Sequence, residues 1–234
     1  MFRRHELVWL TPHGWDAALA QVAEHPTAEA QRSVLAQWRN GGWPAVARRS
    51  EAVKHAANNT ASAAGSTCYL GIAPPPDPHT GAKRRIALQA AAGDVARSAP
   101  PLSITDRLVH AALPSAWRRA FIALASRATG LDVRVYGSLS WQALTHLPCV
   151  TPTSDIDLLF RPQTEQQLHA GLALLNAAQA DLPLDGEIAF PTGQAVAWRE
   201  WLLAVHGEAR VLVKQEDGVR LLDTHALLAT LRSA

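Results

Sequence analysis

Two aspartates separated by a single residue are the pair in this sequence whose spacing points most directly to chemistry. Asp155 and Asp157 stand in the run Ser154-Asp155-Ile156-Asp157-Leu158-Leu159, whose apolar members predict a buried strand over 156–160. Because side chains alternate between the two faces of a strand, both carboxylates point the same way. Such a pair repels itself unless a cation lies between, and hard oxygen ligands suit Mg²⁺ or Mn²⁺. The spacing therefore predicts a divalent metal site.

A Gly-Ser pair upstream of these acids strengthens the hypothesis. A lone Asp-x-Asp arises by chance about once in a chain of this length, so its surroundings matter more than the motif itself. Gly137 and Ser138 follow an extended run over 133–136. Glycine lets a backbone approach a ligand closely, and the neighbouring amides and hydroxyl can hold a phosphate. We predict a phosphate-binding turn beside the metal site; the alternative is an edge strand with incidental acids.

The third candidate carboxylate comes from Leu184-Asp185-Gly186-Glu187, at the start of a predicted strand over 185–190. Asp185 and Glu187 are two residues apart and share one face of that strand. A third carboxylate beside an Asp-x-Asp pair is what two-metal phosphoryl transfer requires. The spacing does not say which acid is used, and Glu187 is the preferred candidate.

Charge is divided unevenly along the 234 residues. Residues 1–130 carry 15 basic and 8 acidic groups (+7), and residues 131–234 carry 7 basic and 12 acidic groups (−5). A basic half beside an acidic half suggests that one binds an anion while the other collects carboxylates. Solvated surface charge is the alternative interpretation.

The elements that position these residues divide the chain into two domains. Extended runs are predicted over 6–10, 45–49, 69–72 and 83–88, and helices within 15–38. Together they suffice for a small α+β domain. Residues 50–67, rich in Ala, Ser, Asn and Thr, predict a loop or a weak helix. Consecutive prolines stiffen a linker at 98–101, so we place the domains at 1–98 and 99–234.

The second domain has an α+β pattern as well. Two helices divided at Pro114 are predicted within 103–128. Strands are predicted over 133–136, 156–160, 185–190, 195–198 and 210–215, and helices over 140–147 and 164–180. The pairs Thr192-Gly193 and Asp217-Gly218 are typical of hairpin turns.

Composition excludes several classes of protein. No apolar run approaches the ~18 residues of a membrane span, and the N-terminus has no secretory signal pattern. Cys68 and Cys149 are far apart and outside any metal-type cluster, so we expect inert thiols and a cytoplasmic location. The basic groups form no stripe interleaved with aromatics, so nucleic acid is not an expected partner. We expect Trp141 and Trp198 to pack in the core or at a domain seam; stacking on an adenine is the alternative.

These motifs resemble the nucleotidyltransferase superfamily, although the sixteen residues between Ser138 and Asp155 are more than that superfamily usually allows. A closer resemblance is to the phosphoribosyl-dephospho-CoA transferases, the holo-acyl-carrier-protein synthases of malonate decarboxylase. The resembling segments in the second domain are Gly137-Ser138-Leu139-Ser140-Trp141-Gln142, 154–159, 184–187, Trp198-Arg199-Glu200 and Val211-Leu212-Val213-Lys214. Those in the first are His5, 7–10, Arg48-Arg49 and 70–72. The resemblance implies a nucleotidyltransferase-like mixed sheet with helices, preceded by a smaller, basic α+β domain.

The resemblance also implies a reaction. The donor is triphosphoribosyl-dephospho-CoA and the acceptor is a serine of the apo acyl carrier subunit. The serine oxygen attacks the α-phosphorus, pyrophosphate leaves, and a phosphodiester joins the prosthetic group to the protein. Asp155, Asp157 and Glu187 would then bind Mg²⁺ or Mn²⁺, with Asp185 as the alternative third acid.

Basic residues would meet the many negative charges of such a donor. Lys214 and Arg199, expected on strands near the acids, would face the leaving pyrophosphate. The more distal phosphates would fall to Arg48, Arg49, Lys83, Arg84 and Arg85. For each of these residues a solvated surface charge is the competing interpretation.

Two other functions are compatible with the same residues. The first is an ATP-dependent nucleotidyltransferase that acts on a small molecule or on another protein. The second is a catalytically silent relative that binds a nucleotide or a partner protein. The presence of both Asp155 and Asp157 argues against the second, because a silent relative needs neither acid.

Overall fold

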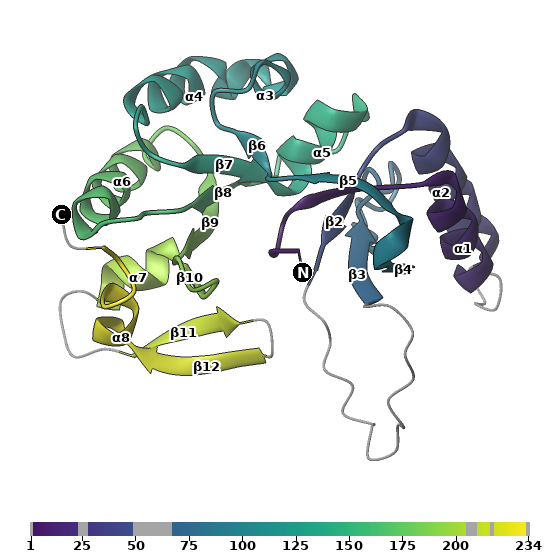
Figure 1. Cartoon of the computed structure of the whole chain (residues 1–234). Helices are drawn as coiled ribbons and strands as arrows, with labels where there is room; N and C mark the ends of the chain where they lie inside the picture. Colours follow the sequence, from purple (N-terminus) through teal and green to yellow (C-terminus); the bar gives the residue numbers. More distant parts are fainter. Residues whose placement is uncertain (1, 23–27, 49–66, 205–209, 216–217, 233–234) are drawn as a thin grey trace, which may run out of the picture. The chain divides into compact units, whose positions relative to one another are not determined.

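The structure, a computed structural model, describes residues 2–22, 28–48, 67–204, 210–215 and 218–232 (Figure 1). It consists of two compact units, Met1–Pro100 (unit 1) and Pro101–Ala234 (unit 2). Both units combine helices with a sheet, which confirms the α+β class. Of the predicted segments, most of 50–67 and the pair Arg49 and Asp217 lie outside the described residues.

Unit 1 is built on a five-stranded antiparallel sheet with the order β4-β3-β2-β1-β5. The strands are β1 (Leu7–Leu10), β2 (Ala45–Ala47), β3 (Thr67–Ile72), β4 (Ile86–Ala91) and β5 (Val95–Ala99). The four expected strands are present. The sequence pattern missed β5, because its alternating small and polar residues resemble a linker. The prediction that β4 begins at Lys83 was wrong: pairing ends at Ile72–Ile86, since the prolines after Ala73 cannot extend a ladder.

Two helices cover the apolar face of this sheet. They are α1 (Pro12–Val22) and α2 (Ala28–Gly41), and they bury Trp15, Leu35 and Trp38. Thr11 caps α1, because its hydroxyl accepts a hydrogen bond from the Gly14 amide at 3.1 Å, and Pro12 suits the first helical position. Gly14 also allows close approach to Asp94, in the 3-10 turn η1 (Ala92–Asp94): an added Cβ would stand 2.9 Å from the Asp94 Cβ.

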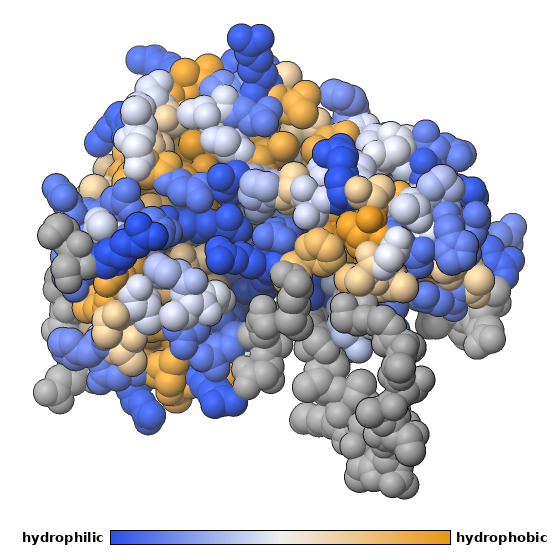
Figure 2. Space-filling view, in the orientation of Figure 1, coloured by the Kyte–Doolittle hydropathy of each residue, from blue (hydrophilic) through white to orange (hydrophobic). Residues whose placement is uncertain are grey.

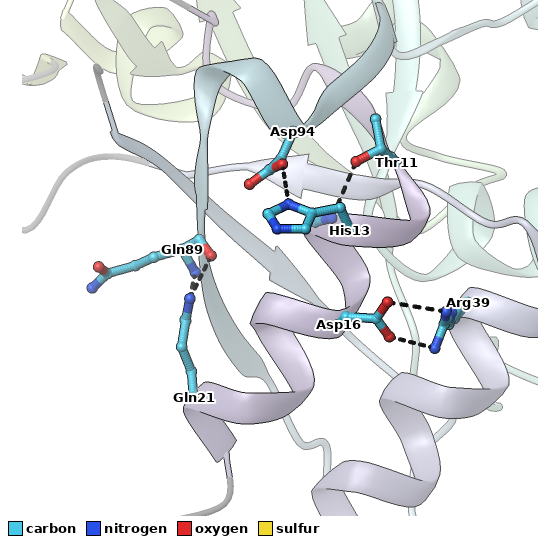
Figure 3. A network of polar contacts seen from close by, with 8 residues as sticks. Thr11, His13, Asp16, Gln21, Arg39, Gln89 and Asp94 are labelled. Atoms are coloured by element: carbon cyan, nitrogen blue, oxygen red, sulfur yellow. Dashed lines mark hydrogen bonds and ion pairs between the residues drawn. The ribbon is translucent and has the colours of Figure 1, made fainter. Parts of the chain in front are cut away.

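Polar side chains of α1 also contact α2 and β4 (Figure 3). Asp16 pairs with Arg39 of α2 at 2.6 Å. The side-chain nitrogen of Gln21 donates to the backbone carbonyl of Gln89 at 2.9 Å, and the side-chain oxygen of Gln21 accepts from the backbone N–H of Gln89 at 3.3 Å. Because β4 is an edge strand, Gln21 occupies hydrogen-bonding positions that an added strand would otherwise use.

Unit 2 is built on a seven-stranded sheet with the order β12-β11-β10-β9-β8-β7-β6. The strands are β6 (Leu102–Ser103), β7 (Val133–Tyr136), β8 (Ile156–Phe160), β9 (Leu184–Ala189), β10 (Ala195–Ala197), β11 (Arg210–Gln215) and β12 (Gly218–Asp223). Strands β8 and β9 are parallel and the other described pairs are antiparallel, which confirms the mixed sheet. The sequence analysis did not predict β6 or assign β12, although it expected the hairpins β9–β10 and β11–β12.

Unit 2 has six described helices, of which the apolar spacing predicted the four from α3 to α6 but not α7 or α8. They are α3 (Arg107–Ala112), α4 (Ser115–Arg127), α5 (Gly137–Thr145), α6 (Glu165–Ala178), α7 (Trp198–Ala204) and α8 (Thr224–Leu228). Pro114 separates α3 from α4, and Thr164 caps α6 by accepting from the Gln167 amide at 3.2 Å. Phe121, Leu172 and the β8 residues Ile156, Leu158 and Phe160 belong to one buried core.

The two faces of this sheet differ in chemistry. Ile156, Leu158 and Phe160 point into the core, so the residues between them on β8 point to the opposite face. That second face carries the predicted acids. In the described part of the chain, no helix is long and apolar enough to cross a membrane.

Candidate active site

The Asp-x-Asp pair lies at the start of a central strand of unit 2. Asp155 directly precedes β8 and is exposed, while Asp157 is the second residue of β8 and is half-buried. The neighbouring strand β7 ends opposite this point, with Tyr136 as the register partner of Asp157. Figure 2 shows hydrophilic side chains gathered over the region where Figure 1 draws β8 and β9.

The Gly-Ser pair lies directly beside Asp157. Strand β7 ends at Tyr136, and Gly137 and Ser138 form the first turn of α5, which begins three residues earlier than predicted. Gly137 has a φ of 67°, and a Cβ there would overlap the Asp157 carboxylate and stand 2.7 Å from its Cγ. Only glycine leaves room for this carboxylate. The amide groups that begin α5 also favour negative charge at this end of the helix.

The register of β9 separates the two candidates for the third carboxylate. Asp185 is the parallel partner of Asp157, so the two acids share a face at the same level of the sheet. Glu187 is level with Leu159, two residues further along. Asp185 is exposed, whereas Glu187 is only 3% exposed. The geometry therefore favours Asp185 over Glu187 as the third acid of the group.

Gly186 makes this close pairing of β8 and β9 possible. Its φ is 138°, and a Cβ would overlap the Leu158 carbonyl oxygen and stand 2.7 Å from the Leu158 nitrogen. A larger residue between Asp185 and Glu187 would force the two strands apart.

The two basic residues expected near the acids occupy different positions from those predicted. Lys214 lies on β11 as expected, but its Nζ is 2.6 Å from Glu187 Oε1. The prediction that Arg199 lies on a strand was wrong: α7 begins at Trp198, because Trp198 and Trp201 are buried at helical spacing. Arg199 is exposed and donates to the Leu184 carbonyl at 2.6 Å, next to Asp185 in the chain.

Two polar residues organise the loop between α5 and β8, and the sequence analysis gave neither a role. Gln142 accepts from the Val150 amide at 3.0 Å and donates to the Ala112 carbonyl at 2.8 Å. The buried Ser154 hydroxyl accepts from the Thr151 amide at 3.0 Å. These hydrogen bonds fix the conformation of the segment that connects α5 to β8, between Ser138 and Asp155. In the sequence, the only indication of a role for Gln142 and Ser154 was that they belong to the runs around Gly137 and Asp155.

The basic residues of the first domain belong to unit 1. Arg48 follows β2, is half-buried, and donates its amide to the Tyr69 carbonyl at 3.0 Å. Lys83, Arg84 and Arg85 precede β4 and are exposed. Arg48 lies next to Tyr69 of β3, whereas Arg85 directly precedes Ile86, the partner of Ile72 on the same strand. Tyr69 and Ile72 are three residues apart, so Arg48 and Arg85 are separated by about 10 Å along β3. Arg49 lies outside the described residues.

The acids can be tested as a metal site by their donor chemistry. Among the described residues, no three His, Cys, Asp or Glu side chains come together as a metal-binding group. Mg²⁺, however, is usually held by one or two carboxylates plus substrate phosphates rather than by a complete protein cage. Asp155 and Asp157, with Asp185 opposite, supply hard oxygen donors beside a turn suited to phosphate. The donor set fits Mg²⁺ that binds together with a phosphorylated substrate.

The two cysteines and the two tryptophans singled out in the sequence are partly or fully buried. Burial raises the pKa of the Cys149 thiol to about 11 and also raises the pKa of Cys68, so both stay protonated at neutral pH, as inert thiols should. Trp141 is 7% exposed and Trp198 is fully buried. Neither indole offers an open face for stacking, so of the two interpretations core packing applies.

Comparison with known proteins matches both units. The family described as phosphoribosyl-dephospho-CoA transferase MdcG N-terminal domain matches residues 3–101, and the one described as phosphoribosyl-dephospho-CoA transferase MdcG C-terminal domain matches residues 103–225. No solved structure matches the chain significantly.

Curated proteins are similar in sequence to this chain over nearly its full length. A protein of Xanthomonas campestris pv. campestris (strain 8004) named phosphoribosyl-dephospho-CoA transferase is 38% identical over 232 residues, 97% of each chain. One from Bradyrhizobium diazoefficiens with the same name is 37% identical, covering 97% of this chain and 92% of its own. The chain is thus an α+β transferase. It belongs to the phosphoribosyl-dephospho-CoA transferase family.

Proposed function

We propose that this transferase moves the phosphoribosyl-dephospho-CoA group from triphosphoribosyl-dephospho-CoA to a serine of the apo acyl carrier subunit of malonate decarboxylase. The serine oxygen bonds to the α-phosphorus, the bond from that phosphorus to the pyrophosphate breaks, and the hydroxyl proton passes to a base. The products are a phosphodiester on the carrier and free pyrophosphate. The enzyme acts as a nucleotidyltransferase of the cytoplasm.

The observation that carries this proposal is that three segments come together where β7 ends and β8 and β9 begin, in the middle of the unit 2 sheet. The turn Gly137-Ser138, the pair Asp155 and Asp157, and Asp185 come together through the registers of β7–β8 and β8–β9. Gly137 and Ser138 would hold a donor phosphate through the amides of α5 and the Ser138 hydroxyl. The carboxylates would bind a cation next to that phosphate.

Asp155 and Asp157 would hold Mg²⁺ or Mn²⁺, and Asp185 is better placed than Glu187 as the third ligand. A bound divalent cation would neutralise phosphate charge and lower the pKa of an attacking hydroxyl. Arg199 donates to the carbonyl of Leu184, the residue before Asp185, and its guanidinium would also contact a phosphate oxygen. Arg48, Arg49 and Arg85 of unit 1 stay candidate contacts for the distal phosphates.

The proposal is tested by mass spectrometry of the apo carrier subunit after incubation with the enzyme, Mg²⁺ and triphosphoribosyl-dephospho-CoA. The expected result is a carrier heavier by one phosphoribosyl-dephospho-CoA group, together with released pyrophosphate. An unmodified carrier, or modification supported by ATP alone, would contradict the proposal and favour another nucleotidyltransferase activity.

A paired substitution then tests the site. We expect Asp157→Asn to abolish pyrophosphate release with the fold intact, because the amide cannot replace a charged ligand. Asp181→Asn, at an exposed acid between α6 and β9, is the matched control and should transfer at the wild-type rate. Equal turnover in the two variants would remove Asp157 from the reaction.

A further inference from the structure

A buried carboxylate on the acidic face of unit 2 is paired with a lysine from two strands away. Glu187 on β9 has a side chain that is 4% exposed, and Lys214 on β11 has one that is 30% exposed. The Lys214 Nζ donates to Glu187 Oε1 at 2.6 Å. The pair therefore joins a group inside the protein to a group that still reaches solvent.

The intervening strand makes this long contact possible. Strand β10 separates β9 from β11, and its residues on this face are Ala195, opposite Lys214, and Ala197, opposite Glu187. Two methyl side chains leave space for the lysine side chain to cross β10 diagonally. A large residue at either position would occupy that space.

Charge explains why the two residues stay together. A carboxylate taken out of water is strongly destabilised unless a cation and hydrogen bonds compensate it. Lys214 supplies that cation, so Glu187 holds the ammonium at one place on the sheet. An ammonium has three N–H donors, and Glu187 accepts from one of them.

The place at which the ammonium is held is close to the predicted phosphate site. Glu187 is two residues along β9 from Asp185, which corresponds to about 7 Å between their Cα atoms. Asp185 in turn is the register partner of Asp157. The Lys214 ammonium therefore lies near Asp157 and Asp185, on the side of β9 that faces β10 and not β8.

We propose that Glu187 is a positioning residue, not a metal ligand: it fixes Lys214, and Lys214 contacts the polyphosphate of the donor. This inference rests on the proposed function, because it assumes a polyphosphate donor. It differs from the sequence-based assignment, in which Glu187 binds the metal and Lys214 acts separately. In the structure the two side chains are one unit.

The two roles for Glu187 predict different kinetics. A positioning residue acts through Lys214, so its loss weakens donor binding and leaves the response to Mg²⁺ unchanged. A metal ligand acts on the reacting group, so its loss lowers kcat and raises the Mg²⁺ concentration needed for half-maximal rate.

The experiment compares Glu187→Gln, Lys214→Met and the double variant, with kcat, the KM for the donor and the Mg²⁺ dependence as readouts. We expect Lys214→Met to raise the donor KM about 10- to 100-fold, the size of one charge-assisted hydrogen bond. Glu187→Gln keeps an acceptor oxygen, so we expect a rise of about 3- to 10-fold with kcat nearly unchanged. The double variant should be no worse than Lys214→Met.

Three controls make the outcome decisive. Lys214→Arg keeps the positive charge and should restore part of the donor affinity. Asp16→Asn breaks the exposed ion pair with Arg39 in unit 1 and should leave the donor KM unchanged. Where Glu187→Gln alone fails to fold, the double variant replaces the buried pair with neutral groups, which proteins usually tolerate better than one unpaired charge.

Additive effects in the double variant would overturn the inference, as would a loss of kcat of about 100-fold or a shifted Mg²⁺ dependence in Glu187→Gln. A wild-type enzyme that transfers nothing from triphosphoribosyl-dephospho-CoA would instead contradict the proposed function itself. Failure of this inference is seen only in the variants, with the wild-type enzyme active.

Discussion

Replacing Gly137 by alanine tests whether transfer depends on the position of the Asp157 carboxylate beside the turn. A Cβ at position 137 would overlap Asp157 Oδ2 and stand 2.7 Å from Cγ and 3.1 Å from Cβ of the same residue. The overlapped atoms are the end of a side chain, so the fold can survive by rotating Asp157 away. The substitution therefore moves the carboxylate without removing it.

Two costs are expected, and they differ in kind. The φ of 67° lies in the left-handed region, where a residue with a Cβ costs about 1–2 kcal/mol of stability. A misplacement of about 1 Å in an active site can lower the rate by about 100-fold. We therefore expect a modest loss of stability and a much larger loss of activity.

Gly130→Ala is the matched control for the backbone cost. Gly130 has a φ of 83° in the same unit, and a Cβ there would meet nothing within 4 Å. Both variants should lose similar stability in urea unfolding. Only Gly137→Ala should release pyrophosphate at about a hundredth of the wild-type rate in the presence of donor and apo carrier.

Equal activity in the two alanine variants would refute the reasoning. It would mean that the position of the Asp157 carboxylate, and with it the contact between β8 and the start of α5, does not matter for transfer.

Three further predictions concern stability and reactivity. Gly186→Ala would push its Cβ into the main chain of Leu158, so we expect more than about 3 kcal/mol of destabilisation by urea unfolding; a smaller loss would mean that β8 and β9 can separate. The hydrogen bond to Asp94 at 2.7 Å, followed by its charge, raises the pKa of His13 above 6.5 (Figure 3). This pair therefore stabilises unit 1 below the unfolded-state pKa and ceases to do so as pH rises through the folded-state pKa; His13→Gln should reduce the difference in Tm between about pH 5.5 and about pH 8.5, and an unchanged difference would contradict the assignment. Because the pKa of Cys149 is about 11, the thiol should resist alkylation at neutral pH until urea unfolds unit 2, and rapid labelling of the folded protein would contradict its burial.

Much of the candidate site follows from local rules. The alternation of a strand predicts that the carboxylates of Asp155 and Asp157 share one face; in the structure Asp157 lies on β8 and Asp155 directly precedes it. The Gly-Ser pair after an apolar run predicted a tight turn, and the structure has Gly137 at a positive φ. Pro114 divides two helices because a proline has no amide hydrogen to continue the first helix, while it is tolerated where the second begins.

Elements without a local pattern were missed or misjudged. Strand β5 and the two-residue β6 have no hydrophobic alternation strong enough to predict them. Arg199 follows two strand-like residues, yet α7 begins before it because two tryptophans one helical turn apart find the same core. Such outcomes depend on what the segment packs against, which its own residues do not specify.

Residue order alone thus determined which side chains share a strand face and where the backbone turns, because these depend on neighbours in the chain. Only the tertiary structure decided that Asp185 stands level with Asp157, and that Glu187 is buried against Lys214. The physical reason is that register between strands and the pairing of buried charges depend on segments far apart in sequence. They are selected by the free energy of the whole sheet, including the small residues Ala195 and Gly186 that allow its strands and side chains to meet.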